Sequence, residues 1–184
     1  AVIVQNELRK EVILKDSFKK LELIAGVDVS YDIKSNLTRA FIVLMNFKTL
    51  HLITSVKAVQ ETTFPYIPGF LSFREAPTII EAIKLLPQKP DLLMVDGQGI
   101  AHPRRFGIAC HLGILTDLPA IGVAKSRLVG KFSEIGANKG ETSVLVDKGE
   151  TIGTVLRSKD KTNQANPGGL STETVKISGK EEVV

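Results

Sequence analysis

Apolar and polar residues alternate along the first third of the chain in two different ways. Residues 5–20 mix charges with apolar residues at helical spacing (Leu8, Val12, Leu14, Phe18), which predicts an amphipathic helix. Residues 21–31, 39–47 and 50–60 are instead rich in β-branched and aromatic residues. Short polar links separate them. We therefore expect three strands in an antiparallel meander.

The second half of the chain alternates helical and strand patterns. A helix is predicted from near Ser72, with Ala76, Ile79, Ile80, Ile83 and Leu86 on one face and Pro77 tolerated only in its first turn. The apolar run 91–96 predicts a buried strand, followed by a helix over 106–115 and a short strand over 120–124. Residues 143–146 and 151–156 predict a hairpin, and the tail from Lys159 looks polar and irregular. This order predicts an α/β fold, a mixed sheet flanked by helices.

Composition narrows the class of protein without identifying it. With 184 residues, 43% of them hydrophobic and 24% charged, we expect one domain spanning residues 1–184 with a substantial core. Cys110 is the only cysteine, so no intrachain disulfide can form, which suits a reducing compartment; we expect a cytoplasmic protein. Neither a membrane span nor a secretory signal is visible. The net charge of +4 and the isoelectric point of about 9.2 permit nucleic-acid binding without demanding it.

Three acidic residues stand where an α/β sheet usually carries its chemistry. Asp28 lies on the first predicted strand, Asp96 ends a buried one, and Glu75 lies near the start of the helix between them. Adjacent strand ends would bring the two aspartates close together, and their repulsion favours a cation between them. Hard oxygen ligands suit Mg²⁺ or Mn²⁺, which can activate water toward a phosphodiester. The alternative is that each acid merely caps a turn.

Basic residues follow two of the predicted strands, 91–96 and 120–124. Lys125 comes directly after the 120–124 strand, as Asp96 ends its own, so a lysine that faces the acids and holds a phosphate is one interpretation. A solvated surface lysine is the other. His102 can shuttle protons or contact phosphate, or it can be incidental, and Arg104 and Arg105 add charge beside it. Gly97 and Gly99 lack the third glycine of a dinucleotide-binding loop, so that function is rejected.

The segment Pro65-Tyr66-Ile67-Pro68-Gly69 is too rich in proline and glycine for a regular element. Its two prolines stiffen the backbone and would hold Tyr66 and Ile67 out on a loop. Such a rigid apolar tip can enter a base stack from which one base has been displaced. Alternatively, Tyr66 folds back onto the core.

Together these segments resemble the endonuclease V family, nucleases that act at deaminated purines. The matching blocks occur in the family's order and span most of residues 5–157. They are Gly26-Val27-Asp28-Val29-Ser30-Tyr31, Pro65-Tyr66-Ile67-Pro68-Gly69-Phe70-Leu71-Ser72-Phe73-Arg74-Glu75, Asp96-Gly97-Gln98-Gly99-Ile100-Ala101-His102-Pro103-Arg104-Arg105-Phe106-Gly107 and Ile121-Gly122-Val123-Ala124-Lys125-Ser126.

The resemblance implies a ribonuclease H-like fold and Mg²⁺-dependent (or Mn²⁺-dependent) cleavage of the second phosphodiester bond 3′ to deoxyinosine in DNA. Asp28, Asp96 and Glu75 would hold the metal, while Lys125 and His102 would assist at the scissile phosphate. Tyr66 would fill the gap left by the displaced hypoxanthine. The other substrate-binding positions implied are Pro65, Ile67, Pro68, Gly69, Gly97, Gly99, Arg104, Arg105 and Ser126. We expect a monomer with DNA as its partner.

The tail departs from the family pattern. The family usually carries a Pro-Gly-His near the start of its last helix, whereas here Pro167-Gly168 is followed by Gly169. Either the histidine is absent or residues are missing from this chain. Two alternative functions therefore stay open: a nuclease of the same fold that acts on inosine in RNA or on a particular DNA structure, and a protein that binds deaminated bases without cleaving.

Overall fold

The computed structural model describes residues 1–16 and 20–160 together with the backbone of residues 172–176. Helix α1 spans Val2–Leu8 and is followed by a single 3-10 turn, η1, over Arg9–Glu11. The prediction of one helix over residues 5–20 is therefore wrong, because residues 12–16 are not helical. Val12 has extended backbone angles and packs against a second hydrophobic cluster instead of continuing the helical face.

The predicted meander is confirmed. Strands β1 (Leu23–Asp32), β2 (Leu37–Asn46) and β3 (Leu52–Glu61) pair antiparallel in sequence order. Along β2, Thr38, Ala40, Ile42 and Leu44 are buried and the residues between them are more exposed. This period of two is the pattern of a strand that covers a core with one face.

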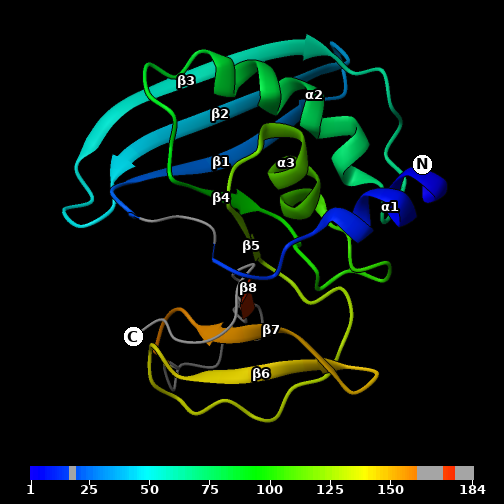
Figure 1. Cartoon of the computed structure of the whole chain (residues 1–184), viewed down its shortest axis with the longest axis vertical. Coiled ribbons are helices and arrows are strands. Elements are labelled where there is room, and N and C mark those ends of the chain that lie inside the picture. Colours follow the sequence, from blue (N-terminus) through cyan, green and yellow to red (C-terminus); the bar gives the residue numbers. More distant parts are fainter. Residues whose placement is uncertain (17–19, 161–171, 177–184) are drawn as a thin grey trace.

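Two parallel strands extend the meander on the other side of β1. Strand β4 (Leu92–Asp96) pairs parallel with β1, and β5 (Ala120–Ala124) pairs parallel with β4. Helices α2 (Leu71–Lys84) and α3 (Ile108–Thr116) precede these strands and lie on one side of the sheet (Figure 1). The fold is thus the expected ribonuclease H-like mixed sheet, an antiparallel meander plus parallel strands flanked by helices.

The sheet continues past β5. The predicted hairpin is present as β6 (Thr142–Asp147) and β7 (Glu150–Arg157), and β8 (Thr172–Lys176) joins it to β5. The strand order in the described residues is β3-β2-β1-β4-β5-β8-β7-β6. The tail from Lys159 is therefore not wholly irregular, because β8 is a strand. Pro167, Gly168 and Gly169 lie outside the described residues.

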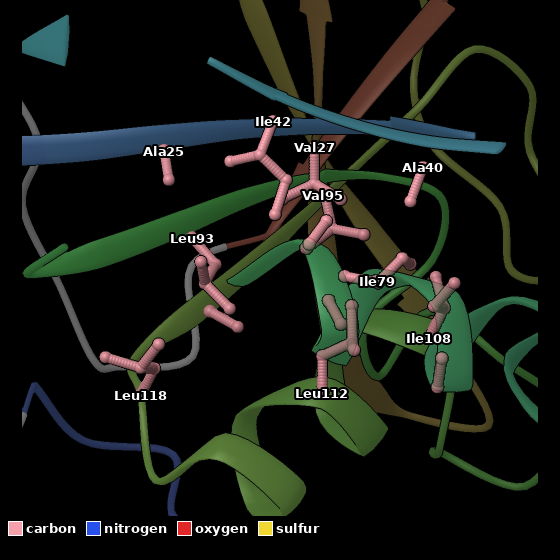
Figure 2. Close-up of a cluster of buried hydrophobic side chains, with 14 of the residues drawn as sticks. Ala25, Val27, Ala40, Ile42, Ile79, Leu93, Val95, Ile108, Leu112 and Leu118 are labelled. Atoms are coloured by element: carbon pink, nitrogen blue, oxygen red, sulfur yellow. The ribbon is translucent and has the colours of Figure 1, made fainter. Parts of the chain in front are cut away.

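The main hydrophobic core lies between the sheet and the two helices (Figure 2). Ala25 and Val27 of β1 and Leu93 and Val95 of β4 share this cluster with buried residues of both helices, namely Ile79, Ile108 and Leu112. These aliphatic side chains leave water on folding, which is the main favourable contribution to stability. The core thus fixes β1 and β4 side by side, and with them the residues at their ends.

Pro77 lies in the second turn of α2, whereas the sequence pattern favoured the first turn. A proline at this position removes one hydrogen bond from the helix and leaves a carbonyl without its amide donor. Pro77 is on the exposed side of the helix, where water can satisfy that carbonyl. The helix continues to Lys84.

In the part of the chain that the structure describes, helices are too short or too polar to cross a lipid bilayer.

Candidate active site

The register of the sheet places two aspartates at the ends of neighbouring strands. Val27 of β1 pairs with Val95 of β4, so Asp28 and Asp96 occupy the next position on each strand. Glu75 approaches from the first half of α2. The three carboxylates line one pocket of about 360 Å³. The structure thus brings together the three acids that the sequence pattern singled out.

Glu75 has an unusual acidity in this pocket. Burial raises the pKa of its carboxyl to about 7, nearby Arg74 opposes the rise, and the negative charges of Asp96 and Asp28 add to it. Near neutral pH, Glu75 is therefore divided between its neutral and charged forms. Glu75 would lose its proton more readily if a cation were bound beside these carboxylates.

Lys125 supplies one positive charge at the edge of the pocket. It directly follows β5, the strand parallel to β4, and its Nζ lies 2.6 Å from Oδ2 of Asp96. The lysine side chain is 75% exposed and the aspartate 31% exposed. Lys125 therefore contacts one of the acids and is also accessible from solvent. Of the two interpretations drawn from the sequence, a lysine facing the acids and a solvated surface lysine, the structure combines features of both.

The chemistry of the acids fits a hard divalent cation, although their present arrangement does not form a closed coordination shell. All three are carboxylates, the donors that Mg²⁺ and Mn²⁺ prefer. Among the described residues, no three His, Cys, Asp or Glu side chains converge on a single metal position. Asp96 pairs with Lys125, and Oδ1 of Asp28 accepts the Val29 amide at 2.9 Å. A cation would compete with Lys125 for Asp96 and would share the Asp28 carboxylate with the Val29 amide.

His102 lies in the pocket wall as a buried, neutral side chain. Its Nδ1 accepts the Arg104 amide at 3.2 Å, so its Nε2 carries the proton and donates to the Gly69 carbonyl, also at 3.2 Å. Burial, followed by the charge of Arg104, lowers the pKa of His102 to about 4; the bond to Gly69 opposes this, and Arg105 adds a smaller lowering. At neutral pH both ring nitrogens are thus engaged in holding the pocket together.

The proline-rich loop projects Tyr66 beside the same pocket. Tyr66 is 64% exposed, so it does not fold back onto the core. The base of the loop is held by Phe73 of α2, whose ring lies 5.6 Å from that of Phe64 and 6.2 Å from that of Phe70. The loop is therefore anchored at both ends and exposed at its tip.

The remaining predicted substrate residues divide into two groups. Pro68, Gly69, Gly97 and Ser126 line the pocket with Tyr66. Pro65 and Ile67 are exposed on the loop but lie outside the pocket lining, and Gly99 lines a separate cavity behind the 97–99 segment.

Arg104 and Arg105 do not line the pocket, and their role in binding substrate stays a prediction. Arg105 binds Asp147 and Glu150, with both N–O distances at 2.7 Å, and its side chain is only 10% exposed. Arg104 donates to the Gly69 carbonyl at 2.7 Å and lies over the Phe70 ring. Both guanidinium groups thus have partners on neighbouring segments of the protein.

Sequence reasoning missed three contributors to the pocket. Gln5 of α1 reaches it from the far N-terminus, and Gln98 donates from Nε2 to the Ser126 carbonyl at 2.8 Å. At Gly122, a side chain would collide with the backbone of residues 97–99, so this glycine lets the pocket loop cross β5 closely. Gln98 and Gly122 lie inside recognisable motifs. The position of Gln5 left no local signal, since a glutamine on an amphipathic helix is ordinarily exposed.

Comparison with known proteins relates the whole chain to one family. The sequence model of the Endonuclease V family matches residues 6–167. An endonuclease V from Rippkaea orientalis is 54% identical over 159 residues, which make up 86% of this chain and 69% of that protein. The solved structure of endonuclease V from Streptomyces avermitilis has a TM-score of 0.83 and 38% identity, covering 97% of this chain and 75% of that one. A variant of endonuclease V from Ciona intestinalis, solved with DNA containing an inosine followed by a ribo-adenosine, has a TM-score of 0.77 and 25% identity, covering 96% and 80%.

Proposed function

Because the chain belongs to the endonuclease V family, we propose that it is a metal-dependent endonuclease that cleaves DNA at the second phosphodiester bond 3′ to deoxyinosine. Deoxyinosine arises when adenine loses its amino group, so the reaction would serve the repair of deaminated DNA. One observation carries the proposal: three carboxylates, Asp28, Glu75 and Asp96, share a pocket with the exposed-tip loop of Tyr66.

The three carboxylates would hold Mg²⁺ or Mn²⁺. When bound, such an ion polarises the phosphodiester and lowers the pKa of an attacking water. Lys125 would exchange its contact with Asp96 for an oxygen of the scissile phosphate, acting there as a point charge. His102 would assist as a neutral group in the wall, because its depressed pKa and its two hydrogen bonds leave it unprotonated and engaged at neutral pH.

The other half of the pocket would receive the displaced base. The volume of the whole pocket, about 360 Å³, lies within the range of about 300–1,000 Å³ usual for ligand sites. Gly69 and Gly97 line the pocket, and their lack of side chains would let the edge of hypoxanthine approach the backbone. Tyr66 would take the place of that base in the stack, where an aromatic face is favourable next to either neighbour. The Ciona intestinalis protein, solved with inosine-containing DNA, supports this class of substrate.

The proposal is tested by a single-turnover assay on a duplex with one deoxyinosine, with Mg²⁺ present. Asp96→Ala removes a carboxylate from the pocket, whereas Asp16→Ala removes an exposed one outside it. We expect Asp96→Ala to lose nearly all nicking and Asp16→Ala to retain it. An undiminished rate in Asp96→Ala would refute the assignment.

One observation favours a second substrate of the same site. The DNA bound to the Ciona intestinalis protein carries a ribo-adenosine directly after the inosine. A ribonucleotide at that position is compatible with an inosine-specific nuclease that acts on RNA. Cleavage rates on matched ribo- and deoxyribo-inosine strands distinguish the two substrates, and Mg²⁺-dependent nicking of either one excludes a protein that only binds.

A further inference from the structure

Gln5 is a polar residue whose side chain is buried. It lies on the short helix α1 and is only 1% exposed. Both ends of its amide are satisfied: Nε2 donates to the carbonyls of Gly69 at 2.9 Å and Phe106 at 3.4 Å, and Oε1 accepts from Nε of Arg104 at 2.5 Å. A buried amide bonded in this way fixes the geometry of the groups around it.

Gln5 joins two segments that contribute to the pocket wall. Gly69 ends the loop that carries Tyr66, while Arg104 and Phe106 belong to the segment that follows β4. The Gly69 carbonyl is a shared acceptor, since Nη2 of Arg104 at 2.7 Å and Nε2 of His102 at 3.2 Å also point to it. Gly69 itself has a φ of +81°, a conformation that other residues adopt only with strain.

We infer that Gln5 is a positioning residue for base recognition: it holds the Tyr66 loop against the 104–106 segment and so sets the width and orientation of the pocket wall. This inference rests on the proposed function. Gln5 acts through Gly69 and Arg104, and both ends of its side chain are engaged by protein groups. Helix α1 is thereby part of the recognition apparatus, although it carries none of the acidic residues.

Two substitutions separate the parts of this role, and a third controls for helix α1 itself. Gln5→Leu keeps a similar volume and removes all three hydrogen bonds. Gln5→Glu keeps an acceptor for Arg104 and removes the donor to Gly69, so that a carboxylate oxygen faces a carbonyl oxygen. Asn6→Leu changes the neighbouring, exposed side chain of the same helix.

The first measurement uses the free protein. Amide hydrogen exchange of the peptide covering residues 64–70 is compared among the variants, with the β2–β3 turn at residues 47–50 as an internal reference. We expect faster exchange in the loop for Gln5→Leu and Gln5→Glu, unchanged exchange for Asn6→Leu, and no change at the reference turn. Unchanged loop exchange in both Gln5 variants would overturn the inference, whatever the substrate of the enzyme.

The second measurement is a double-mutant cycle on DNA binding. For wild type, Gln5→Leu, Tyr66→Ala and the double variant, the affinity for a deoxyinosine duplex is compared with that for an undamaged duplex. We expect Gln5→Leu to reduce the inosine preference roughly tenfold, a loss typical of one or two hydrogen bonds. In the Tyr66→Ala background the further loss should be small, since the two residues act through one loop. Fully additive losses would overturn the inference, whereas a wild type without any inosine preference would refute the proposed function and, with it, the recognition role.

Discussion

The Nζ of Lys125 lies 2.6 Å from Oδ2 of Asp96, so the lysine neutralises a carboxylate that the proposed metal would bind. The same ammonium group cannot compensate Asp96 and a scissile phosphate equally well. Metal binding and substrate binding would therefore both favour its release from Asp96. For the proposed metal, this ion pair would be an internal competitor at Asp96.

This competition predicts two opposite effects of Lys125→Gln. Without the ammonium group, Asp96 is available to the metal, so we expect half-maximal activity at a Mg²⁺ concentration several-fold lower than in the wild type. At saturating Mg²⁺ the rate should fall by roughly 100- to 1,000-fold, the range usual for losing one electrostatic donor at a reacting group. Single-turnover nicking measured over a Mg²⁺ titration reports both values. Lys131→Gln, outside the pocket lining, serves as the control, and an unchanged Mg²⁺ midpoint together with an unchanged rate would contradict the role of Lys125.

Glu75 predicts how the stability of the metal-free protein depends on pH. The pKa of its carboxyl is about 7 in the folded protein against an ordinary value of 4.5, so the folded state binds more protons than the unfolded state between these values. The contribution of protonated Glu75 to the free energy of unfolding is fully present below about pH 4.5. It is lost as the pH rises through 7. Glu75→Gln should therefore leave stability at pH 4 unchanged and raise it at pH 8 by up to about 3 kcal/mol, on the scale of 1.36 kcal/mol per pKa unit.

Urea unfolding of wild type and Glu75→Gln with a chelator present measures this difference. Saturating Mg²⁺ should reverse the order at pH 8, because the ion stabilises only a folded state that can bind it. Glu81→Gln, on the exposed part of the same helix, controls for a general loss of negative charge. If Glu75→Gln is no more stable than the wild type at pH 8 without metal, the carboxylate is not held in an unfavourable setting.

The exposure of Tyr66 predicts a selective binding defect. Tyr66→Ala should weaken binding to a deoxyinosine duplex by about 1–3 kcal/mol, the usual contribution of one base stacked on an aromatic ring. Binding to an undamaged duplex should change much less. Fluorescence anisotropy on the two duplexes measures both, with Ile33→Ala removing an apolar side chain elsewhere that is even more exposed. Equal losses on both duplexes would show that Tyr66 does not respond to the displaced base.

The contacts of Arg105 predict that replacing it lowers the stability of the protein and leaves its contacts with DNA phosphates unchanged. Its guanidinium group is bound by Asp147 and Glu150 of the β6–β7 hairpin and is largely buried. Arg105→Gln should lower the free energy of unfolding by about 1–3 kcal/mol, less than for a fully buried pair because Glu150 is half exposed. The slope of DNA affinity against salt concentration should stay unchanged, since no phosphate contact is lost. A shallower slope in Arg105→Gln would restore the phosphate-facing role expected from sequence.

The acidic residues of the site could be predicted from the sequence because each is marked by its immediate neighbours in the chain. Asp28 and Asp96 each interrupt or end an apolar run, and parallel strands end at one edge of a sheet. The side-chain partners of the arginines were not accessible in the same way. Arg104 and Arg105 look identical in sequence, yet one binds Gln5, 99 residues away, and the other binds the turn at 147–150. Such contacts depend on how the segments pack, which hydrophobic periodicity does not record.

The predictions for the N-terminal helix and for the tail were wrong for a related reason. Val12, Leu14 and Phe18 continue the helical spacing of residues 5–11, but Val12 already packs against another cluster, so tertiary contacts override the helical pattern. In the tail, β8 is short and polar in sequence. It pairs with β5 and β7 through backbone groups, and such pairing leaves no hydrophobic pattern from which a strand could be predicted.

The most direct test of the account is the position of the nick. A duplex carrying one deoxyinosine, labelled at the 5′ end of that strand, is incubated with the protein and Mg²⁺, and the product is sized at single-nucleotide resolution. The account predicts one product, cut at the second phosphodiester bond 3′ to the inosine, with a 3′-hydroxyl end, and no product when the metal is chelated. Cleavage that ignores the position of the inosine, or that persists without a divalent cation, would contradict it.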